Sequence, residues 1–177
     1  MKGRGPLICA MLPLLSLVVA LIMADRANAK PHVDKHEILR SIDQVGAVAT
    51  VEGLWATGAW DVMSDHIGDG EAEWIALAPK LAPGTDGAAA EGLGIALATA
   101  LPKNPIAVLS ATDPKDGFVF GISRVCSIPF LEPSKAFVKR YRAQTLASVS
   151  SVHSPRLAKA RHACLVVLRQ PRAANPF

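Results

Sequence analysis

The stretch from Asp65 to Gly87, DHIGDGEAEWIALAPKLAPGTDG, gathers carboxylates and a histidine around glycines, as metal sites and acid–base sites do. A calcium loop needs oxygen ligands at its third and twelfth positions. With Asp65 at the first position, these places fall on Ile67 and Ala76, so the stretch does not match. Asp65 and His66 are sequence neighbours, and neighbours on a helix do not face each other. We interpret the acids and glycines as helix boundaries, which leaves His66 without a role.

A second cluster lies near the start of the predicted mature chain. His32 and His36 are one helical turn apart and could present two imidazoles to zinc or copper, but no third or fourth ligand accompanies them. An amino-terminal copper site would need a backbone N–H at Pro31, and proline has none. The sequence therefore predicts no metal site.

Motifs for covalent or nucleotide chemistry are also missing. The chain contains no Gly-x-Ser-x-Gly and no Walker A pattern, and Gly92 and Gly94 lie within a predicted helix, where they cannot cradle a phosphate. We therefore predict no catalytic residues, no cofactor and no enzyme activity. A cleft joining Asp65, His66 and Glu91 would revive a hydrolase as an alternative.

The N-terminus carries an export pattern. A basic start is followed by a long apolar run and by Ala27 and Ala29 at the small-residue positions of a cleavage site. We predict a signal peptide over 1–29 and a single periplasmic or secreted helical domain over 30–177. The apolar run just reaches the length of a membrane span, so an uncleaved anchor is the alternative.

Two cysteines remain after residue 29. In an exported chain, Cys126 and Cys164 are expected to form a disulfide, with two buried free thiols as the alternative. The bridge would close a loop of about 39 residues and contribute about 4 kcal/mol in the chain-entropy description.

Helix signals fill most of the remaining sequence. Asp34 and Asn104 stand at N-cap positions, and Trp55 and Trp60 fall within an apolar pattern that places both in the core. Glu91 is the only charge on a helix of small apolar residues, and we expect it on the exposed edge. The expected helices cover residues 34–48, 50–67, 69–79, 88–101, 105–111, 132–152 and 156–170. The sequence thus predicts an all-α compact bundle of about six to seven short antiparallel helices, with one irregular or extended segment near 118–130.

Charge is distributed unevenly along the chain. Residues 30–116 contain 6 Lys or Arg and 13 Asp or Glu, whereas residues 117–177 contain 10 Lys or Arg and one acid, Glu132. This polarity indicates either an anionic partner for the C-terminal third or two oppositely charged parts that attract each other.

The basic residues of the C-terminal third form a candidate binding face. Lys135, Lys139 and Arg142 follow helical spacing, and Arg140 lies beside them. In an exported protein the anionic partner would be a lipid headgroup, lipopolysaccharide or an acidic protein, and we predict no nucleic-acid partner. A solvated helix face without a partner is the alternative.

The segments GDGEAEWIALAPKLAPGTDGAAAEGL, ALATALPKNPIAVL and RVCSIPF together resemble a group of small exported proteobacterial proteins. That resemblance implies an exported helical protein and supplies no site residues. The order of FVFGI, VCSIP and a cysteine-bearing last helix is similar to the Rap1a/Tai type of periplasmic immunity protein. Because catalytic motifs are missing beside a well-marked helical core, we predict a non-enzymatic, protein-binding module of the cell envelope, with an inhibitor- or immunity-like role as its narrower form. Binding to an anionic envelope surface through the basic helices is the alternative.

Overall fold

The computed structural model describes residues 31–113, 115–117, 119–130 and 133–170, and the protein is all-α as predicted. Residues from His32 onward form one compact unit. The helices are α2 (Lys35–Ala56), α3 (Ala59–Gly68), α4 (Ala72–Ile75), α5 (Ala78–Leu81), η1 (Ala82–Gly84), α6 (Gly87–Ala100), α7 (Pro105–Ala111), α8 (Ile122–Val125), α9 (Lys135–Ser150), η2 (Pro155–Leu157) and α10 (Ala158–Arg169). None of them, within the described ranges, is long and apolar enough to cross a membrane.

Helix α2 is two helical segments joined by a sharp bend at Gly46. This residue has φ 85° and ψ 167°, a backbone region that is essentially restricted to glycine. The hydroxyl oxygens of Ser41 and Thr50 lie 2.8 Å apart, whereas nine residues of straight helix would separate them by about 13.5 Å. The two halves of α2 therefore fold back on each other, in agreement with the two separate helices predicted over 34–48 and from residue 50.

The predicted single helix over 50–67 is wrong, because the chain breaks before α3. Gly58 has φ 71° and ends the second half of α2, so that α3 starts again at Ala59. Trp60 is buried as predicted, but Trp55 is 50% exposed, which corrects its predicted place in the core. The centroids of the two indole rings are 5.9 Å apart, but only the Trp60 ring is enclosed by the core.

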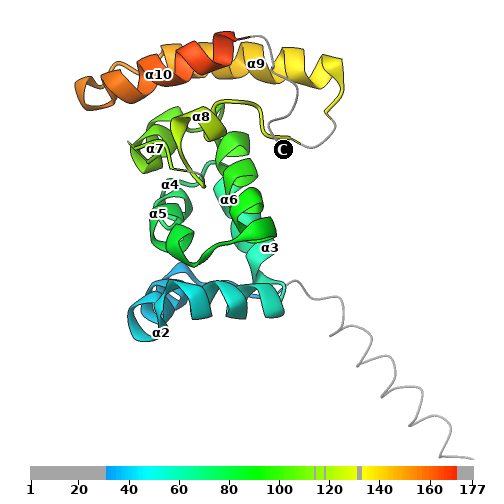
Figure 1. Cartoon of the computed structure of the whole chain (residues 1–177), viewed down its shortest axis with the longest axis vertical. Helices are drawn as coiled ribbons and strands as arrows, with labels where there is room; N and C mark the ends of the chain where they lie inside the picture. The colour runs from blue at the N-terminus through cyan, green and yellow to red at the C-terminus, as the bar shows by residue number, and fades with distance from the viewer. Residues whose placement is uncertain (1–30, 114, 118, 131–132, 171–177) are drawn as a thin grey trace, which may run out of the picture. The chain divides into compact units, whose positions relative to one another are not determined.

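Helix α6 is the buried central helix that its composition predicts. It packs along α3 (Figure 1). Leu93 and Leu97 of α6 are fully buried. Small residues allow this approach, since a Cβ at Gly92 would already touch the Trp60 indole nitrogen at 3.4 Å.

The last two long helices, α9 and α10, lie side by side (Figure 1). Tyr141 of α9 donates a hydrogen bond of 2.7 Å from its hydroxyl to the Ala98 carbonyl of α6. The Phe130 ring packs edge-on against the rings of Phe137 and Tyr141. These contacts fix the direction in which the remaining faces of α9 point.

In the described residues 119–130 the chain is irregular, as predicted for this segment, except for the single turn of α8. Cys126 directly follows α8 and forms a disulfide with Cys164 of α10, and both residues are fully buried. The predicted bridge therefore joins the last helix to the irregular segment.

Candidate anion-binding groove

The structure gives His66 the role that the sequence does not assign. Its Nδ1 lies 2.8 Å from Glu71 Oε1, and its ring stacks on the Trp74 ring with centroids 4.5 Å apart. Asp69 forms an ion pair of 3.0 Å with Lys103. These partners hold the end of α3 in place, so Glu71 and Asp69 act as structural contacts at a helix boundary.

The turn between α3 and α4 is fastened to the start of α7. Asn104 donates from Nδ2 to the Gly70 carbonyl at 2.8 Å, while its Oδ1 accepts from the Ala107 N–H at 3.1 Å and caps α7 as predicted. The single helix predicted over 69–79 is wrong, because the chain forms α4 from Ala72 and then α5, and Glu71 is the N-cap of α4 without a side-chain cap bond. Asp69 turns to Lys103 instead.

One cavity beside α3 contains only one of the three residues considered for hydrolysis, Asp65, His66 and Glu91. A cavity of about 410 Å³ between α3 and α6 includes Asp65 and Asp69 in its lining, whereas neither His66 nor Glu91 lines it. In the part of the chain that the structure describes, no group of three or more His, Cys, Asp or Glu side chains could hold a metal ion. The His66 ring contacts Glu71 and Trp74.

Glu91 is half-buried, which corrects its predicted place on an exposed edge. It lies close enough to Arg124 of α8 for their charges to interact. Burial lowers the pKa of the Arg124 guanidinium, and the Glu91 carboxylate opposes that shift. The guanidinium also packs over Gly94, where a Cβ would lie 2.9 Å from Arg124 Nε. Both residues thus contribute to the packing of α6 against α8.

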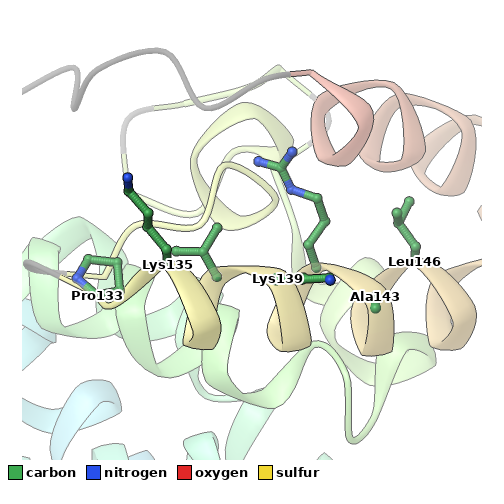
Figure 2. A pocket seen from close by; sticks show the side chains of 7 residues that line it. Pro133, Lys135, Lys139, Ala143 and Leu146 are labelled. Atoms are coloured by element: carbon green, nitrogen blue, oxygen red, sulfur yellow. The ribbon is translucent and has the colours of Figure 1, made fainter.

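The predicted basic face opens into a cavity of about 540 Å³ along α9, called here the α9 groove. Figure 2 shows Lys135, Lys139, Ala143 and Leu146 following one another along the same helix. The residues that line the groove are Pro133, Lys135, Val138, Lys139, Arg142, Ala143 and Leu146. The groove therefore contains three of the four predicted cations, and Arg140 does not line it.

The local sequence of α9 explains why the side chains that line the groove are accessible from solvent. Ser134 caps α9 by accepting a hydrogen bond from the Phe137 N–H at 3.2 Å. Tyr141, Thr145 and Val149, which recur every four residues, are buried against the rest of the protein. The groove residues recur at three and four residues on a different face of the same helix, so burial of one face leaves the other accessible.

The groove is strongly cationic. Residues 133–170 contain eight Lys or Arg and no Asp or Glu. Among the described side chains, no carboxylate lies within ion-pair distance of Lys135, Lys139 or Arg142. Arg142 Nε is buried and has no hydrogen-bond partner in the described ranges. Direct ion pairs between the acidic and basic parts of the chain therefore do not explain the charge of this face.

The spacing of charges in the sequence predicts the cations of the groove but not the apolar residues between them. Val138 and Leu146 lie two turns apart with Arg142 midway, a spacing that the sequence already contains. The alternation gives the groove both a charge that attracts anions and an apolar surface that can be buried on binding.

No family model, curated protein or solved structure matches this chain. The likeness to small exported proteins and to periplasmic immunity proteins stays a prediction.

Proposed function

We propose that this protein is a non-enzymatic, exported binding protein whose α9 groove takes an acidic, partly apolar segment of another protein. The observation that supports this function is the placement of Lys135, Lys139 and Arg142 in one concavity with Val138 and Leu146. An inhibitor or immunity-like role is its narrower form, and a buried disulfide fits the oxidising compartment that export implies.

The shape of the site favours a protein segment over a membrane. The groove runs from Lys135 to Leu146, about 16 Å of helix, which is the length of a short helical or extended peptide. Peptides bound in grooves bury apolar anchors at helical spacing, while charges set orientation and the rate of encounter. A flat anionic surface would instead contact protruding cations whether or not they line a concavity. Lys139 and Arg140 are adjacent exposed cations of α9, but only Lys139 lines the groove. A flat surface would therefore contact both, whereas a segment in the groove would contact Lys139.

The test is a fluorescence-anisotropy titration with a synthetic peptide that alternates Glu and Leu at helical spacing. Lys139→Glu should weaken peptide binding by about tenfold, because a charge-assisted contact in the groove contributes about 1.5–3 kcal/mol. Arg140→Glu makes the same charge change one residue away and should weaken binding by less than about threefold, as expected for an exposed charge.

Vesicles that contain an anionic phospholipid provide the comparison. Equal losses for Lys139→Glu and Arg140→Glu, together with binding to vesicles and not to the peptide, would overturn the proposal in favour of an anionic envelope surface. A peptide that does not bind the unmodified protein at low salt would contradict it as well.

A further inference from the structure

A second concavity of about 460 Å³ lies on the N-terminal side of the fold, between α2, η1 and the start of α6, and is called here the α2 groove. Its lining residues are Val48, Val51, Glu52, Trp55, Ala56, Gly84, Asp86, Ala88 and Ala89. The bend at Gly46 and the break at Gly58 set the direction of the helical segment that supplies most of them.

Large apolar side chains are accessible in this groove. Val48 is 57% exposed and Trp55 is 50% exposed. Exposed apolar groups that gather around a concavity are typical of protein-binding surfaces, and tryptophan is among the commonest anchors of such surfaces.

The rim of the α2 groove is acidic. Glu52 and Asp86 are exposed, and neither forms an ion pair with a described Lys, Arg or His. Asp86 occupies the N-cap position of α6 but makes no side-chain cap hydrogen bond, so its carboxylate is available to a partner. The α2 groove thus combines apolar surface with negative charge, whereas the α9 groove combines apolar surface with positive charge.

The two grooves present matching helical patterns. Val48, Glu52 and Trp55 place an acid between two apolar groups over two turns of α2. Val138, Arg142 and Leu146 place a base between two apolar groups over two turns of α9.

We propose that the α9 groove of one copy of this protein binds the α2 groove of a second copy. This inference rests on the proposed function and names the acidic, partly apolar segment as the second half of α2. Glu52 of one copy pairs with Arg142 of the other, while Trp55 and Val48 are buried against Val138 and Leu146.

Such an interface is heterologous, because it joins two different surfaces. A pair of copies still has one free α9 groove and one free α2 groove. Larger assemblies therefore form as the protein concentration rises, unless the angle between successive copies closes the assembly into a ring. A symmetric contact between two α2 grooves would bring two acidic rims together, each with Glu52 and Asp86, and that like-charge contact disfavours it.

Sedimentation velocity of the full chain, purified as it accumulates in the cell, tests the pairing. We expect the sedimentation coefficient to rise with protein concentration at low salt and to fall when salt is added. Glu52→Lys and Arg142→Glu should each weaken association by about tenfold or more, since each places like charges opposite one another. The double variant carrying both changes should recover most of the lost association, because the two charges are exchanged.

Arg140→Glu is the matched control and should leave self-association unchanged. Loss of association in both single variants without recovery in the double variant would overturn the pairing of Glu52 with Arg142. A chain that stays monomeric at every concentration, but whose α9 groove still binds the acidic peptide, would overturn this inference and leave the proposed function standing. A chain that neither associates nor binds the peptide would contradict both.

Discussion

The hydroxyl oxygens of Ser41 and Thr50 lie 2.8 Å apart, although nine residues separate them along a segment that is helical on both sides. Thr50 also donates to the Gly46 carbonyl at 2.8 Å. These two hydrogen bonds stabilise the reversal of α2, and the backbone conformation of Gly46 makes the reversal possible. The exposed residues of the α2 groove follow directly after this reversal, so the groove depends on it.

Replacing Gly46 by alanine should lower the free energy of unfolding by about 1–3 kcal/mol, because a side chain strains the backbone at φ 85°. A Cβ there would meet no atom within 4 Å, so the loss would come from the backbone and not from a clash. Urea unfolding followed by circular dichroism measures the change. Gly53→Ala is the control, since Gly53 lies within the helix with open space around it, and stability should stay equal or rise by up to about 1 kcal/mol. Equal effects at both glycines would contradict the account of the bend.

Tyr141 should make stability depend on alkaline pH. Burial raises the pKa of its phenol well above the ordinary value of 10.0. The unfolded chain therefore loses this proton at lower pH than the folded chain, so the stabilisation is complete below pH 10.0 and is lost as pH rises further. It is the only tyrosine of the chain, so the near-ultraviolet absorbance of phenolate reports it directly. Ionisation at the ordinary pKa, without unfolding, would show that the side chain is not buried.

Tyr141→Phe separates the hydrogen bond from the packing of the ring. The variant keeps the contacts with Phe130 and Phe137 but loses the donor to the Ala98 carbonyl. We expect a loss of about 1 kcal/mol at neutral pH and a weaker dependence of stability on alkaline pH than in the unmodified protein. Thermal unfolding of the two proteins across a pH series gives both quantities. Identical pH profiles would argue against the anchoring of α9 by this hydroxyl.

Removal of the disulfide should destabilise the protein as a whole. Replacing Cys126 and Cys164 together by alanine is expected to lower the free energy of unfolding by about 2–5 kcal/mol. Addition of a reductant should lower the stability of the unmodified protein and leave the double variant unaffected. A reductant effect of the same size in both proteins would mean that the two cysteines are not bridged.

Export should leave a defined N-terminus. If residues 1–29 are a signal peptide, N-terminal sequencing of the accumulated protein in a cell fraction should begin at Lys30. Substitution of Ala29 by a bulky residue should block processing and retain the longer chain. A protein that keeps residue 1 and sediments with membranes would support the uncleaved anchor.

The sequence predicts the helices best where a local signal marks an end. Asp34 accepts a hydrogen bond from the His36 N–H, and Asn104 caps α7, as their positions before apolar repeats indicate. The break at Gly58 is missed because the apolar spacing continues through it, and a glycine with positive φ leaves no mark on that spacing. The predicted burial of Trp55 fails for the same reason.

The two grooves also differ in how far the sequence predicts them. The cations of the α9 groove come from a single helix, so their spacing along the chain is enough to predict that they share a face. The α2 groove combines α2 with η1 and the first turn of α6, where Gly84 approaches so closely that a Cβ would lie 2.3 Å from the Ala47 backbone. That contact joins residues far apart in sequence, and only the packed fold reveals it.

Photo-crosslinking in the cell tests most directly whether the α9 groove binds a protein. A photoreactive amino acid at Ala143 lies in the groove, whereas one at Ala147 lies on the same helix, is exposed and does not line it. We expect a discrete protein adduct from position 143 that is weak or missing from position 147 and is lost with Arg142→Glu. Adducts of equal yield from both positions, or a position 143 adduct that persists with Arg142→Glu, would contradict this expectation.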